Sequence, residues 1–89
     1  MNEIVKGLLH YLFNRKYIGE RHIPEDRALK PRLKKMSKKE QKEFYKYYHD
    51  LINEAIILRV KKKTGKGQDW HISLNPKSTK TIKVIELER

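Results

Sequence analysis

The apolar residues at the start of the chain repeat at helical spacing. They follow the i, i+1, i+4, i+5 pattern of a helix buried on one face, at Ile4, Val5, Leu8, Leu9, Leu12 and Phe13. This pattern predicts a first helix over residues 2–14. The next segment, residues 16–23, combines Gly19 with β-tending side chains and indicates a turn followed by a short strand.

Two prolines frame the second predicted helix. Pro24 suits the first position of a helix, and Glu25 and Asp26 would lie at its positive end. Because a proline disfavours helical geometry in the residue before it, Pro31 predicts that this helix ends at Lys30. The second helix is therefore expected over residues 24–30.

A third helix is predicted to begin at Ser37. Glu40 follows three residues later, so each side chain can satisfy a free backbone amide of the other residue. The helical period assigns one face to the core, at Phe44, Tyr48, Leu51, Ile52 and Ala55. The opposite face carries Lys38, Lys42, Tyr45, Lys46 and His49. Tyr47 lies between the two faces and could pack on the first helix.

A β-hairpin is predicted after the third helix. The β-branched run IILRVKKK leads to the turn sequence TGKG, and QDWHISL then alternates apolar and polar residues. In this hairpin Trp70 should pack at the base, and His71 should face solvent on the opposite side. Asn75 and Pro76 resemble the start of a helix, so we expect a short final helix within residues 76–89.

The predicted order is helix, strand, helix, helix, strand, strand, helix. This α+β order is typical of a winged helix-turn-helix, with a three-helix core, a β-hairpin wing and a short C-terminal helix. No repeat and no composition break divides the chain, so residues 1–89 are expected to form a single winged-helix domain.

Two sequence runs resemble a group of small archaeal winged-helix proteins. They are YIGERHIPEDRALK and LINEAIILRVKKKTGKGQDWHISLNP, and the similarity covers roughly residues 17–76. Its most telling pieces are HIPED and the closing HISLNP. The resemblance implies the winged-helix scaffold more than a particular function. The chain departs from the group after the third helix, where Asn53, Glu54 and Ala55 stand in place of an expected glycine.

The positive charge is concentrated in the middle of the chain. The formal net charge is +11, and residues 30–66 carry thirteen Lys and Arg against four acids, a net charge of +9. A field of this sign attracts polyanions. Because the charge falls on the expected connector, third helix and wing, the sequence predicts binding to nucleic acid, with duplex DNA as the first choice and a regulatory role in transcription.

The predicted interface has two parts. The third helix, about residues 37–54, would lie in the major groove, while the wing, about residues 59–68, would lie on the backbone. Phosphate contacts are expected from Lys34, Lys35, Lys61, Lys62, Lys63 and Lys66. The helix surface is expected to present Lys38, Lys39, Gln41, Lys42, Tyr45 and Lys46, with Gln41 the best candidate to read an adenine edge.

Other chemistries find little support in the sequence. The chain has no cysteine, and its histidines (His10, His22, His49 and His71) lack metal-binding spacing, so neither a metal nor another cofactor is expected. His22 is expected to satisfy nearby backbone. No nucleophile and base can be assembled into a catalytic set, and TGKG lacks the spacing of a nucleotide-binding loop, which indicates a protein that is not an enzyme. Without a membrane-spanning run or a signal peptide, we expect a cytoplasmic protein.

Two alternatives remain open. Winged helices also serve as protein-docking domains, so the basic face could meet an acidic partner, or the first helix could form a homodimer. Exposed apolar surface on the first or last helix would favour that interpretation. The composition also does not separate DNA binding from RNA binding.

Overall fold

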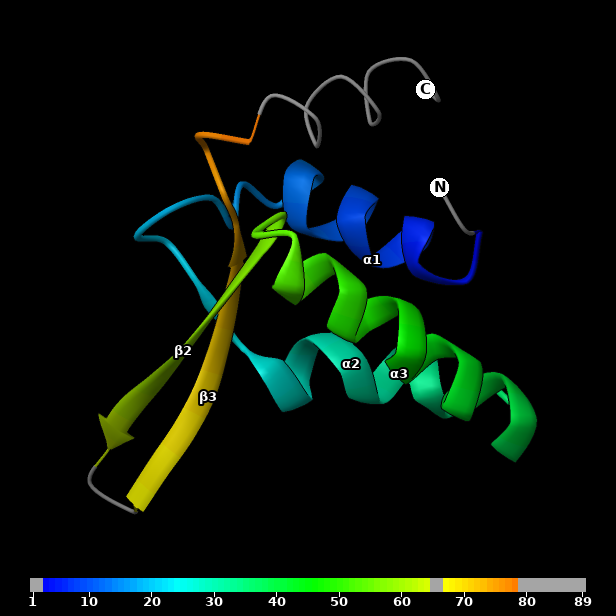
Figure 1. Ribbon diagram of the computed structural model, residues 1–89. Coiled ribbons are helices and arrows are strands. Elements are labelled where there is room, and N and C mark those ends of the chain that lie inside the picture. The colour runs from blue at the N-terminus through cyan, green and yellow to red at the C-terminus, as the bar shows by residue number, and fades with distance from the viewer. Residues whose placement is uncertain (1–2, 65–66, 79–89) are drawn as a thin grey trace.

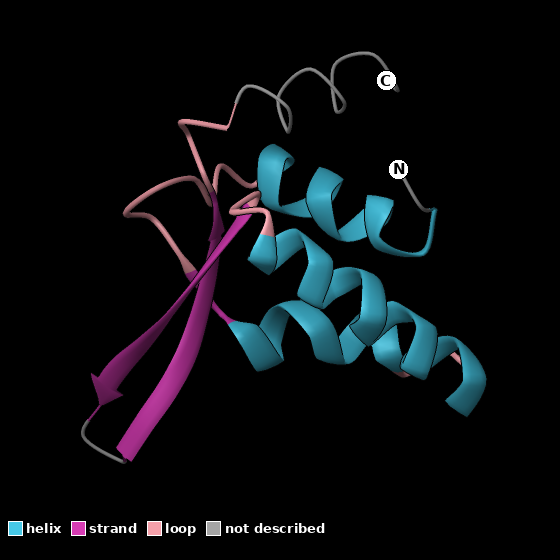
Figure 2. Cartoon of the chain, viewed as in Figure 1, coloured by secondary structure: helices cyan, strands magenta, loops and turns pink. Residues whose placement is uncertain are grey.

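Three helices pack together on one side of a long β-hairpin, and the far end of the hairpin extends beyond them (Figure 1). The computed structural model describes residues 3–64 and 67–78. The elements are α1 (Glu3–Asn14), β1 (Ile23–Pro24), α2 (Glu25–Leu33), α3 (Lys38–Asn53), β2 (Ile57–Thr64) and β3 (Gly67–Leu74). Figure 2 shows the same helices and strands by type. The described residues thus form an α+β fold, compatible with a winged-helix layout.

All of these elements contribute side chains to one hydrophobic core. Its fully buried large side chains are Val5, Leu8, Leu9, Leu12, Ile23, Phe44, Tyr48, Ile57 and Ile72. Four of the six apolar positions predicted for the first helix are buried, and the other two pack against the core from its edge. The periodicity of α1 therefore gave the correct buried face.

The second helix runs three residues further than predicted. It begins at Glu25, with Pro24 as its N-cap, and continues through Pro31 to Leu33. The Lys34 amide donates to the carbonyl of Lys30 at 3.1 Å, so helical geometry persists past the proline. Ala28 and Leu29 are buried and Leu33 packs against the core, so tertiary packing outweighs the local preference of the residue before proline. The predicted end at Lys30 was wrong.

The third helix begins as predicted. The Glu40 amide donates to Ser37 Oγ at 3.1 Å, and the Ser37 amide donates to Glu40 Oε1 at 3.0 Å. Hydrogen bonding from the Ser37 backbone and side chain to the Glu40 carboxylate lowers the pKa of Glu40. Phe44, Tyr48 and Leu51 are buried as expected, and Ile52 is half-buried.

Ala55, predicted as a core residue, lies beyond the end of α3 and is exposed. It takes a left-handed conformation, with φ 57°, at the position where a glycine was expected. The amides of Ala55 and Ile56 donate to the carbonyls of Ile52 and Leu51, which closes the helix by the Schellman pattern. α1 ends in the same way at Lys16, where φ is 60°. Both helices therefore turn sharply without glycine.

The sheet is antiparallel in the order β1-β3-β2, so β3 is its central strand. β2 and β3 pair along their whole length, from Ile57 opposite Leu74 to Thr64 opposite Gly67. The hairpin prediction is confirmed. β1 pairs its Pro24 with His71 and lies at the end of the segment where a short strand was expected.

His71 does not face open solvent, as the sequence had suggested. It is only 9 % exposed, and its Nδ1 lies 2.8 Å from Nδ1 of His22, so one ring donates and the other accepts. Burial, followed by the charges of His22 and Lys62, lowers the pKa of His71. The reason is the pairing of β1 with β3, which brings His22 over the outer face of the hairpin.

The chain leaves β3 through a short turn. Asn75 Oδ1 accepts a hydrogen bond from the Lys77 amide at 3.0 Å, and Asn75 Nδ2 donates to the carbonyl of Ala55 at 2.8 Å. Asn75, expected as a helix cap, thus caps a turn and also ties this turn to the end of α3. The predicted final helix lies outside the described residues.

Candidate nucleic-acid interface

The outer face of α3 presents a stripe of lysines, which we call the α3 stripe: Lys38, Lys39, Lys42 and Lys46. Successive residues of a helix turn by about 100°, which places these four within about a third of the circumference and opposite the buried Phe44 and Leu51. All four are exposed. Glu43 and Asp50 follow along one edge of the stripe, so its most positive part lies toward the other edge.

Tyr45 borders the α3 stripe on the other edge and is 40 % exposed. Its ring packs edge-on against Phe44 at 5.9 Å and against Tyr48 at 6.5 Å, between centroids. The ring is therefore held in place while one side stays open to solvent. This is the exposed position that the helical pattern predicted for Tyr45.

Gln41 is used within the protein. Its Nε2 donates to the carbonyl of Leu33 at 2.9 Å and, more weakly, to that of Met36 at 3.3 Å. These bonds fasten α3 to the end of α2 and the following turn. The amide nitrogen that was expected to read an adenine is thus already occupied.

A carboxylate joins α2, α3 and β2. Glu25 accepts two hydrogen bonds from Arg59, at 2.7 Å from Nε and 2.9 Å from Nη2, and a third from Tyr48 Oη at 2.6 Å. Burial alone would raise the pKa of Glu25, but the bonds from Arg59 and Tyr48 outweigh it and hold that pKa below its usual value. Burial and the bond to Glu25 raise the pKa of Tyr48. We call these three residues the Glu25 cluster.

The Glu25 cluster fixes the base of the hairpin against α3, and sequence reasoning missed it. Glu25 was explained there by its place at a helix start. Its partner Arg59 is 34 residues away along the chain, a separation that carries no local signal. Only the position of Arg59 in a strand next to the helices brings the two together.

The hairpin lysines divide between its two faces. Arg59 lies over the ring of Trp70 at 3.9 Å from the centroid, and Lys61 lies near the same ring at 5.6 Å. Because side chains alternate along a strand, Lys63 shares the face of Arg59 and Lys61, while Lys62 points to the other face. Lys62 is paired in register with Asp69. Lys66 lies outside the described residues.

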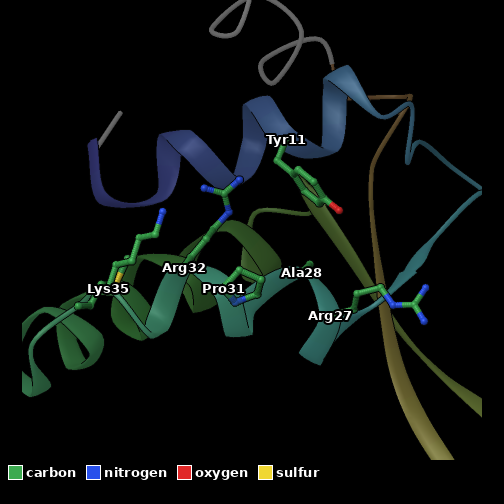
Figure 3. Close-up of a pocket in the computed structure, with 7 residues that line it drawn as sticks. Tyr11, Arg27, Ala28, Pro31, Arg32 and Lys35 are labelled. Carbon is green, nitrogen blue, oxygen red and sulfur yellow. The ribbon is translucent and has the colours of Figure 1, made fainter.

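The two connector lysines are also separated. Lys34 is exposed at the end of α2. Lys35 lines a groove between α1 and α2, together with Tyr11 and Arg32 (Figure 3). The structure therefore does not gather Lys35 with the α3 stripe.

Within residues 3–64 and 67–78, no group of three or more His, Asp or Glu side chains could hold a metal ion. No helix in that part of the chain is long and apolar enough to cross a membrane. Comparison with protein-family models, with curated proteins and with solved structures found no match to this chain.

Proposed function

We propose that this chain is a winged-helix protein that binds duplex DNA through α3 and its hairpin. The α3 stripe carries the proposal: four exposed lysines share one helix face, and none is in an ion pair with a carboxylate of the described residues. An exposed helix of this width fits the major groove, where lysines can reach both phosphates and base edges.

The hairpin supports the same proposal. The Glu25 cluster holds β2 beside α3, so Lys61 and Lys63 extend on the side of the hairpin that faces the helices. Cations there can reach the DNA backbone next to the groove that receives α3. Lys62 points the other way and contributes less. Gln41 is left out of base recognition because its amide nitrogen is engaged.

The exposed apolar side chains do not support dimerisation through α1. Among the described residues, the large apolar side chains that are exposed are Tyr45, Val60 and Trp70, and none lies on α1. Duplex RNA offers a deep, narrow major groove that a helix does not enter. The helix-based interface therefore favours DNA over duplex RNA.

The test is a titration of labelled duplex DNA at several salt concentrations. If the α3 stripe, Lys61 and Lys63 each meet a phosphate, about six contacts should weaken affinity about 10³-fold between 50 and 200 mM salt. The variant K38E/K42E/K46E should lose binding while its circular dichroism spectrum stays folded.

A matched control reverses three charges elsewhere, in R15E/R21E/K77E. These exposed residues lie at the end of α1, before β1 and after β3, and none belongs to the α3 stripe or to the free end of the hairpin. The control should keep most of its affinity if the interface is local. Equal losses in the two variants would show that net charge alone binds DNA, and tighter binding to duplex RNA in the same titration would reject the choice of DNA.

A further inference from the structure

A second basic region lies in the groove between α1 and α2, apart from the α3 stripe. The groove has a volume of about 420 Å³ and is lined by Tyr11, Arg27, Ala28, Pro31, Arg32, Lys35 and Met36. Three of these residues are cationic and none is acidic. The volume lies in the range of small-molecule sites.

Arg32 is the unusual member of this set. It is half-buried, yet its guanidinium pairs with no carboxylate of the described residues and lies over the ring of Tyr11 at 5.3 Å. Burial lowers the pKa of Arg32. Partial burial makes a guanidinium without a counter-charge less favourable than the same group in open water, so an anion at this groove would be stabilised by Arg32.

Gly7 lies next to this guanidinium. A Cβ at Gly7 would lie 3.0 Å from Arg32 Nη1, so the end of the arginine side chain would have to shift by a few tenths of an ångström. Glycine inside a helix costs about 1 kcal/mol relative to alanine. The middle of α1 thus carries a residue that weakens the helix, beside the present position of the Arg32 guanidinium.

The three cations follow one another along α2 and the turn after it. Arg27 and Arg32 lie about 7.5 Å apart along the helix axis, and Lys35 follows in the turn beyond the helix end at Leu33. In Figure 3, Arg32 and Lys35 reach toward α1, while Arg27 extends toward the hairpin. Cations at both ends of one groove suit an elongated anion better than a single phosphate. Ala28, Pro31 and Met36 add an apolar surface beside these cations.

We propose that the α1–α2 groove binds an organic polyphosphate of the nucleoside triphosphate class. The phosphates would lie along Arg32 and Lys35 with Arg27 closing one end, and the nucleoside would lie on the apolar surface. Bidentate guanidinium contacts suit phosphate oxygens, and an anion would supply the counter-charge that Arg32 lacks. The site is concave and does not use the α3 stripe, so it is independent of the proposed DNA interface.

The experiment measures binding of ATP to the full chain by calorimetry, in EDTA and without DNA. ATP should bind with a stoichiometry of one. R32Q should weaken binding about tenfold, the loss expected for one charged hydrogen-bonding group. Because Arg32 is half-buried, R27Q/K35Q serves as a second variant with exposed substitutions only, and it should weaken ATP binding at least as much. The control K39Q/K42Q, which removes the same number of charges from the α3 stripe, should change ATP affinity little.

Three outcomes of the calorimetry would overturn the proposal. They are absence of ATP binding, equal losses in R27Q/K35Q and K39Q/K42Q, and inorganic tripolyphosphate binding as tightly as ATP, which would leave no role for the nucleoside. Adenosine alone should not bind, because it lacks the charge. A fourth arm titrates duplex DNA: if R27Q/K35Q weakens DNA binding as strongly as K39Q/K42Q does, the groove is a DNA contact and the small-molecule proposal fails.

Discussion

Arg59 and Arg32 have the same local arrangement but different surroundings. Each guanidinium lies over an aromatic ring, Arg59 over Trp70 at 3.9 Å and Arg32 over Tyr11 at 5.3 Å. Arg59 also forms a two-bond ion pair with Glu25, whereas Arg32 has no carboxylate in the described residues. With its acidic partner, Arg59 links β2 to the helices. Arg32, which lacks such a partner among the residues described, is instead a candidate binding group.

The largest expected effect on stability comes from removing the carboxylate of Glu25. Glu25→Ala should lower the free energy of unfolding by about 3 kcal/mol, because it leaves the buried Tyr48 hydroxyl and the Arg59 guanidinium without their acceptor. Urea unfolding measures this change. The matched control is Asp26→Ala, which removes an exposed acid from the same helical turn and should cost no more than about 1 kcal/mol. Equal effects would mean that Glu25 acts only through the helix dipole.

Low pH should also weaken the Glu25 cluster. The pKa of Glu25 is lower in the folded chain than in the unfolded one, so the unfolded state binds the proton more readily. The stabilisation is therefore complete above the unfolded value of about 4.3 and is lost as pH falls through the folded pKa. The difference in unfolding free energy between wild type and Glu25→Ala should be constant near neutral pH and shrink below about pH 4. A difference that persists unchanged to pH 2.5 would contradict the assignment.

Replacing Arg32 should change stability much less than replacing Arg59. Arg32→Met should change the free energy of unfolding by less than about 1 kcal/mol, because methionine can cover the same apolar surface and no acid is left unpaired. Arg59→Met should cost more, since it strands the carboxylate of Glu25. Parallel urea unfolding of the two variants makes the comparison directly. A larger loss of unfolding free energy for Arg32→Met than for Arg59→Met would show that Arg32 stabilises the fold.

The smallest effect is expected at Gly7. Gly7→Ala should gain up to about 1 kcal/mol from helix propensity, offset by the displacement of Arg32 Nη1 from its place 3.0 Å from the new methyl group. Stability should therefore change little while ATP affinity falls about twofold or more. Thermal unfolding and calorimetry on one preparation separate the two. Unchanged affinity would show that the position of this guanidinium does not matter for binding.

The sequence predicted those parts of the fold that depend on local signals. Signals within single segments correctly predicted the period of α1, the Ser37–Glu40 cap and the hairpin. The path of α2 through Pro31 was not, because the burial of Leu29 and Leu33 decides it and only the packed structure shows this.

The candidate site divides in the same way. Helical spacing was enough to assemble the α3 stripe, since its members are one, three, four, seven or eight positions apart. It was not enough to find that Gln41 is engaged by backbone carbonyls, that Lys35 turns toward α1, or that His71 meets His22. Each of these depends on how two elements lie against each other, which no single segment encodes.

The corner at Ala55 has a consequence for how the protein would meet a duplex. The chain passes from α3 into β2 through one left-handed residue, and Asn75 holds that residue's carbonyl at 2.8 Å. Together with the Glu25 cluster, this corner sets the angle between helix and hairpin before any ligand arrives. The conformational entropy of arranging the two elements is therefore lost during folding and not at association, which is the condition for docking as a preorganised rigid body.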